Sequence, residues 1–123
     1  MTILRGDAGG VIFRRTDQAN LSSLYQFRID QYGRYGLYLH TGSTSSGIKI
    51  LIEGSSNAIN TGLNHENVIT VIASGSAIYM YVNGLFVANV KDSTLSGGQI
   101  GLTASDYSNS TEVVFQDAKV WTV

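Results

Sequence analysis

Cysteine and proline are both absent from this chain of 123 residues, and charged side chains make up only 14% of it. The absence of cysteine excludes disulfide bonds, a thiolate nucleophile and a zinc site with sulfur ligands. The low charge excludes a chain that self-repulsion keeps unfolded, since 43% of the residues are hydrophobic. We therefore expect residues 1–123 to form a single folded domain with one core.

The chain also lacks an excess of positive or of negative charge. Eight Lys and Arg against nine Asp and Glu give a formal net charge of −1, far from the basic excess that binding to a phosphate backbone needs, so we expect no nucleic-acid partner. No apolar run approaches the roughly 20 residues that span a bilayer, and residues 1–10 lack the apolar segment of a signal peptide. We expect a soluble chain without membrane insertion, and the sequence assigns it no compartment.

What the chain does contain is the hydrophobic pattern of β-strands. In residues 24–30, Tyr25, Phe27 and Ile29 alternate with polar side chains, and a similar alternation returns in residues 34–40. Strict alternation predicts a strand with one buried face and one solvated face. No stretch has the spacing of an amphipathic helix.

About nine strands at a spacing of roughly ten residues follow from this pattern. Asn83-Gly84 stands between two apolar runs and predicts a tight hairpin, because both central residues of a type I′ turn need a positive φ. The predicted strands span residues 10–15, 24–30, 34–40, 48–53, 68–73, 77–83, 85–90, 99–104 and 113–123. They predict an all-β fold, an antiparallel two-sheet β-sandwich of the jelly-roll type, with no significant helix.

Four segments of the sequence carry a resemblance to a known family. GDAGGVIFR at 6–14, YQFRID with GRY at 25–35, IYMYVNG at 78–84 and EVVFQDAKV at 112–120 resemble the concanavalin A-like lectin/glucanase superfamily. More narrowly, they are similar to its laminin-G-like and keto-disaccharide-hydrolase-like bacterial jelly rolls. The resemblance covers essentially the whole chain and implies a convex and a concave sheet, with carbohydrate often held on the concave side. The superfamily includes lectins, glycosidases and non-catalytic modules, so the resemblance implies the fold better than the function.

The beginning of the chain departs from the pattern of that family. Such domains usually have a strand that ends just before the Gly-Asp-Ala-Gly-Gly turn and pairs with the C-terminal strand, whereas only residues 1–5 precede the turn here. We expect a domain that lacks part of the usual N-terminus. Either residues 1–4 form a short remnant strand, or the C-terminal strand 113–123 has no neighbour. Proteins usually cover an open apolar strand edge, so we expect a homo-oligomer, a dimer, in which the copies supply the missing cover.

The sequence contains no recognised arrangement of residues for hydrolysis. Glycoside hydrolysis uses two carboxylates on either side of one bond. Around Glu53, Glu66 and Glu112 nothing matches the Glu-x-Asp-x-x-Glu or Glu-x-Asp-x-Glu strand that the resemblance would imply for a glucanase. His40 and His65 stand alone, and no serine lies in a Gly-x-Ser-x-Gly elbow. We therefore expect no catalytic residues, although a glycoside hydrolase of the same fold stays open as an alternative.

Oxygen ligands for a calcium ion are few. Asp106 and Asn109 share one polar loop, and Asp7 could add a third oxygen. Loops of this composition are typical of ordinary turns. We expect neither a metal nor a cofactor.

The strongest candidate site is the solvated sheet face. If the large apolar residues of three neighbouring strands face the core, the opposite face carries the ligand-binding candidates Arg14, Gln26, Arg28, Tyr38 and His40. Planar side chains and forked donors are the groups that sugar rings and hydroxyls use. The alternative is an ordinary solvated sheet face. We therefore favour a non-catalytic carbohydrate-binding or interaction module with a glycan or protein ligand, and a purely structural or oligomerisation domain stays open beside it.

Overall fold

The computed structural model describes residues 1–18, 21–42, 47–105 and 109–120, and for Gln18 only the backbone. Every regular element in these residues is a strand: β1 (Thr2–Arg5), β2 (Ala8–Gln18), β3 (Leu21–Asp30), β4 (Arg34–Thr41), β5 (Ile48–Ser55), β6 (Ile69–Ser74), β7 (Ala77–Val82), β8 (Leu85–Lys91), β9 (Gln99–Ser105) and β10 (Glu112–Val114). The all-β prediction is confirmed. Over the same residues no helix is long and apolar enough to cross a membrane.

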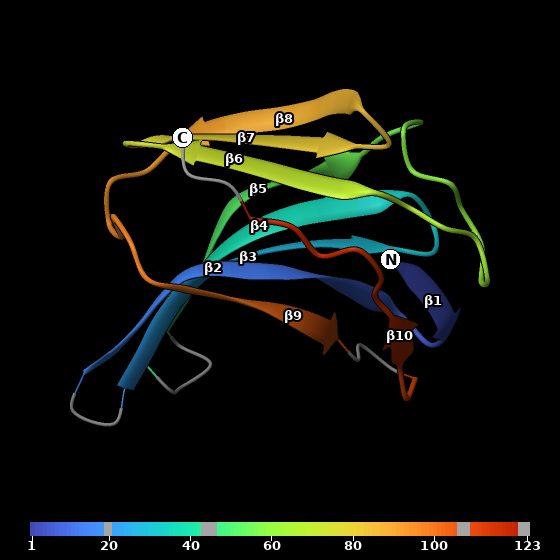
Figure 1. The fold of residues 1–123 in the computed structure, drawn as a ribbon, viewed down its shortest axis with the longest axis horizontal. Helices are drawn as coiled ribbons and strands as arrows, with labels where there is room; N and C mark the ends of the chain where they lie inside the picture. The colour runs from blue at the N-terminus through green and yellow to red at the C-terminus, as the bar shows by residue number, and fades with distance from the viewer. Residues whose placement is uncertain (19–20, 43–46, 106–108, 121–123) are drawn as a thin grey trace.

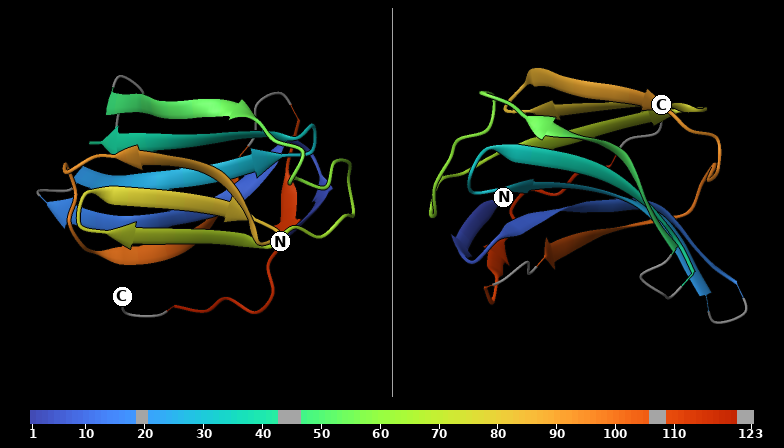
Figure 2. Two further views of the ribbon diagram at one scale, coloured as in Figure 1. Left: turned by 90° about the horizontal axis from the view of Figure 1, so that it is seen from above. Right: turned by 180° about the vertical axis from the view of Figure 1, so that it is seen from behind.

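The strands form two main sheets that pack face to face (Figure 1). One sheet has the order β5-β4-β3-β2-β9, the other has the order β6-β7-β8, and β1 pairs with β10 in a small third sheet. All neighbours in these sheets are antiparallel. The predicted antiparallel β-sandwich is therefore confirmed. In the right-hand view of Figure 2, β2 to β4 arch along their length, and the inside of the arch faces away from β6, β7 and β8.

The core lies between the two sheets. Its fully buried side chains are Tyr25, Phe27, Ile29 and Leu37 from the five-stranded sheet and Ile78, Met80 and Val82 from β7. Burial of each such side chain stabilises the fold by about 1.5–3 kcal/mol. The alternation of residues 24–30 thus predicted the buried face of β3 correctly.

The turn between β7 and β8 has the geometry that its sequence predicts. Asn83 and Gly84 adopt φ values of 54° and 76°, and Val82 pairs with Leu85 on either side of them. The Asn83 side chain also accepts a hydrogen bond from the Val68 backbone N–H and donates to the carbonyl oxygen of Ala58. Asn83 therefore both allows the tight turn and ties it to the chain that precedes β6.

The two ends of the chain meet in the β1–β10 pair. Thr2 lies opposite Val114 and Ile3 opposite Val113, so the first alternative holds, in which the initial residues form a short strand beside the C-terminal one. The predicted C-terminal strand 113–123 is too long, because β10 ends at Val114 and residues 115–120 are not in a strand. Asp117 has a φ of 54°, which interrupts an extended backbone. Residues 121–123 lie outside the described residues.

Candidate functional site

The register of β2 to β5 defines a face of the five-stranded sheet that points away from the core, called the outer face below. Gln26 lies opposite Tyr38, and Arg28 lies opposite Gly36, which in turn lies opposite Glu53. These residues alternate along β3 and β4 with buried core side chains, so they share the other face. His40, two residues beyond Tyr38 on β4, lies on the same face. Four of the five candidates from sequence are thus brought together.

Arg14 does not join them. The pairing of β2 is irregular between Phe13 and Thr16, and Arg14 has a φ of 51°. Its Nη1 donates to the carbonyl oxygens of Gly75 at 2.8 Å and Leu95 at 3.1 Å, which ties β2 to the loops around the three-stranded sheet. The expectation that Arg14 shares the outer face is wrong, because a bulge breaks the alternation of a strand and re-aims its side chains.

Gln26 organises one half of the outer face. It is only 6% exposed, and its Nε2 donates to Ser105 Oγ at 3.1 Å and makes a longer contact of 3.5 Å with Thr103 Oγ1. His40 Nε2 donates to Gln26 Oε1 at 3.0 Å, since that oxygen has no proton to give. Burial, and then the nearby Arg28 guanidinium, lower the pKa of His40 below its ordinary value. A neutral imidazole held by an amide is thus part of a connected polar network that reaches from β9 to β4.

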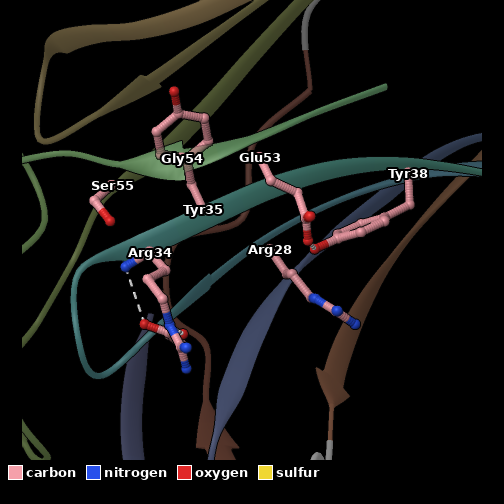
Figure 3. A pocket seen from close by; sticks show the side chains of 8 residues that line it. Arg28, Arg34, Tyr35, Tyr38, Glu53, Gly54 and Ser55 are labelled. Atoms are coloured by element: carbon pink, nitrogen blue, oxygen red, sulfur yellow. Dashed lines mark hydrogen bonds and ion pairs between the residues drawn. The ribbon is translucent and has the colours of Figure 1, made fainter. Parts of the chain in front are cut away.

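Tyr38 organises the other half. Its hydroxyl donates to Glu53 Oε2 at 2.6 Å, and the Arg28 guanidinium carbon lies 4.3 Å from the centre of the Tyr38 ring, within cation–π range. Burial, with the hydrogen bond to Glu53, raises the pKa of Tyr38 to about 12. The ring lies along its own strand over Gly36. This position needs a glycine there, since a Cβ at Gly36 would overlap the Tyr38 hydroxyl. Figure 3 shows Tyr38 and Glu53 pointing toward each other beside Arg28.

Beside this cluster the outer face is hollowed. The hollow is open to solvent, has a volume of about 500 Å³ and is lined by Arg28, Asp30, Arg34, Tyr35, Tyr38, Glu53, Gly54 and Ser55 (Figure 3). Asp30 is only 2% exposed, and its carboxylate accepts from the backbone N–H of Tyr32 and from both the backbone N–H and Nε of Arg34. The two guanidinium groups of the hollow thus balance its two carboxylates.

Sequence reasoning missed the acidic half of this hollow. Asp30 precedes the turn that leads to Gly33, and an Asp at that place commonly accepts hydrogen bonds from the backbone of the turn. Glu53 lies in a strand with apolar neighbours, and its place opposite Gly36 is set by the pairing of β4 with β5, which is regular from Arg34 to Leu37. The signal for Asp30 was therefore present in the sequence, whereas the contact of Glu53 with Tyr38 depends on the pairing of β4 with β5.

Two of the three calcium candidates, Asp7 and Asn109, contact each other. Asp7 is buried, and its carboxylate accepts from the backbone N–H and the side-chain amide of Asn109 at 3.1 Å and 3.2 Å. This contact joins the start of β2 to the segment before β10. Asp106 lies outside the described residues, and the described part of the chain holds no group of three His, Cys, Asp or Glu residues that could bind a metal ion.

A solved structure shares this architecture. The chain is similar to the carbohydrate binding module CBM66 from Bacillus subtilis, with a TM-score of 0.65 and 21% identity, over 82% of this chain and 60% of that one. At this identity the likeness shows the β-sandwich fold. The chain thus spans 60% of the length of that module. No family model matches the chain, and no curated protein matches it.

Proposed function

We propose that this chain is a non-catalytic carbohydrate-binding module that holds its ligand in the hollow of the outer face. The observation that carries the proposal is the cluster of Arg28, Tyr38 and Glu53, in which each group is held by another before any ligand arrives. Prior ordering lowers the entropy that binding would cost. The fold shared with a carbohydrate binding module supports the proposal, as do the resemblance to concanavalin A-like lectins and the arch of β2 to β4.

The chemistry of the hollow suits a neutral sugar. A guanidinium group offers several donors in one plane, and a carboxylate accepts from two hydroxyls at once, so Arg28 and Glu53 together match the adjacent hydroxyls of a sugar ring. The hollow volume of about 500 Å³ falls in the range of roughly 300–1,000 Å³ that is usual for small-molecule sites. Because its two arginines are balanced by two carboxylates, it has no net charge that would select an anionic ligand.

The hydrogen bonds of the two carboxylates in the hollow, Asp30 and Glu53, favour a binding function over hydrolysis. Asp30 accepts three hydrogen bonds from the adjoining turn, which makes it a support for Arg34. Glu53 accepts the hydroxyl proton of Tyr38. A glycosidase needs one carboxyl group that donates a proton to the leaving oxygen, and both carboxylates here act as acceptors.

A glycan array with variants of matched charge tests the proposal. We expect wild-type protein to bind, Arg28→Ala and Glu53→Gln to lose signal by tenfold or more, and Arg5→Ala to bind as wild type does, because Arg5 is exposed in β1. Binding that persists in both hollow variants would place the site elsewhere. A folded wild-type protein that binds no glycan would contradict carbohydrate binding and favour a structural domain. Turnover of chromogenic glycosides would contradict a non-catalytic role.

A further inference from the structure

The two edges of the five-stranded sheet differ in charge. Along β5, one edge, Lys49 is exposed and Glu53 carries an opposite charge. At the other edge, β9 has the sequence QIGLTAS and carries no charge; among the described residues it pairs only with β2. Proteins usually protect a free edge strand with charges, lysine above all. By this criterion β5 is protected against strand pairing and β9 is not.

The face of β9 that continues the core carries exposed apolar side chains. Leu102 lies opposite Val11, which packs against the core, yet Leu102 is 50% exposed and Ile100 is 58% exposed. Figures 1 and 2 show the reason: the five-stranded sheet diverges from β6, β7 and β8 toward β9. β9 therefore combines an uncharged free edge with an exposed apolar face.

We propose that two copies of this chain dimerise through β9, with the two β9 strands antiparallel about a two-fold axis at Leu102. Leu102 is the midpoint of the seven residues Gln99–Ser105, so this register pairs every residue of the strand with one in the other copy. Leu102 then lies opposite its own counterpart, and Ile100 lies opposite Ala104. The apolar side chains of both copies share one face, and no like charges meet.

A second copy suits this edge because the strand is complementary to itself. Gln99, Gly101, Thr103 and Ser105 alternate with Ile100, Leu102 and Ala104, and reversal about Leu102 leaves that pattern unchanged. Thr103 and Ser105 already contact Gln26 on the outer face, so their side of β9 is fixed. A strand with charged residues on only one half would lack this symmetry.

The dimer would bring two binding hollows to one side of a continuous ten-stranded sheet. This consequence rests on the proposed function. Two sites on one rigid body bind a polysaccharide more tightly than a single site does, because the second contact becomes intramolecular. Binding to a short soluble oligosaccharide gains nothing from the second site.

Light scattering at micromolar concentrations tests the dimer directly. We expect wild-type protein to have the mass of two chains and Leu102→Lys to have the mass of one. Leu85→Lys is the matched control, since Leu85 is 59% exposed on β8, and it should stay dimeric. A wild-type monomer throughout this range, or a Leu102→Lys variant that remains dimeric, would overturn the proposal. Circular dichroism verifies that all three proteins are folded.

Cysteine scanning tests the register without relying on a destabilised variant. The chain has no cysteine, so Leu102→Cys introduces a single thiol that faces its own copy across the axis. Cross-strand Cα distances of about 4.5–5.5 Å match those of a disulfide. Mild oxidation should link most Leu102→Cys chains in pairs and few Leu85→Cys chains; equal linkage in both would contradict the register.

A comparison of two ligand formats separates the dimer from the binding function. Leu102→Lys should bind a soluble oligosaccharide as wild type does and an immobilised polysaccharide about 100-fold more weakly. Equal polysaccharide binding by the two proteins would contradict the bivalent arrangement. If wild-type protein is dimeric but binds no glycan, the proposed function fails and the dimer stands.

Discussion

The hydroxyl of Tyr38 on β4 donates a 2.6 Å hydrogen bond to Glu53 on β5, although a register shift separates these two strands between Leu37 and Tyr38. The bond joins the neighbouring strands on the face that solvent can reach. It also fixes the phenol ring beneath the Arg28 guanidinium. The rigidity of the proposed site therefore depends on a contact that lies outside the core.

The ionisation of Tyr38 should make stability fall at high pH. Its folded-state pKa is raised to about 12, above that of an unfolded tyrosine near 10, so the stabilisation is complete below about pH 10 and is lost as the pH rises toward 12. Relative to Tyr38→Phe, wild type should lose roughly 1–2 kcal/mol of unfolding free energy over this window after solvent screening. Urea unfolding at pH 9, 10 and 11 measures the difference, and parallel curves for the two proteins would contradict the raised pKa.

The protonation of His40 should make the stability of the fold fall at low pH. Its folded-state pKa is lowered by burial and by Arg28, so its contribution is fully present above the unfolded value of about 6.5 and is lost as the pH falls below it. The hydrogen bond to Gln26 survives protonation, since Nε2 remains a donor. Thermal unfolding between pH 7.5 and 5 should show a steeper loss for wild type than for His40→Gln. The exposed His65 provides the control through His65→Gln.

Substitution of Gly36 by alanine should displace the Tyr38 ring. The added Cβ would overlap the Tyr38 hydroxyl, so the hydrogen bond to Glu53 must break or the strand must shift, at a cost of about 1–3 kcal/mol. Gly97→Ala is the matched control, because a Cβ there meets nothing within 4 Å, and it should change stability by less than about 0.5 kcal/mol. Denaturant midpoints of both variants, with glycan binding of Gly36→Ala, measure the effect. Equal stability of the two variants would show that the ring adapts freely.

Replacement of Asn83 by glycine separates its two roles. Glycine tolerates the positive φ of the turn, but it loses the hydrogen bonds to Val68, Ala58 and Asn67. We expect a loss of about 1–3 kcal/mol, because buried Asn67 loses a partner. Asn89→Gly, at an exposed position of β8, controls for the entropy of an added glycine. If Asn83→Gly costs no more than the control, the side chain contributes only its backbone preference.

The prediction of which residues share the outer face holds where the alternation of a strand is regular. Gln26, Arg28, Tyr38 and His40 share a face because β3 and β4 pair without interruption from Ser23 to Ile29. It was wrong for Arg14, which lies within a bulge, and it missed Glu53, whose contact with Tyr38 depends on the pairing of β4 with β5. One extra residue in a strand reverses the faces of the residues that follow.

The sequence by itself determined the local structure of this protein. Alternating side chains determined which residues of β3 face the core, and Asn83-Gly84 determined a hairpin, because both signals act over a few bonds of backbone. Only the tertiary structure decided that β1 closes against β10, that Arg14 bonds to the loops of the other sheet, and that β9 is left with an exposed apolar face. These features depend on contacts between segments far apart along the chain, and the free energy of such contacts comes from packing and hydrogen bonds that form only when the whole sandwich is assembled.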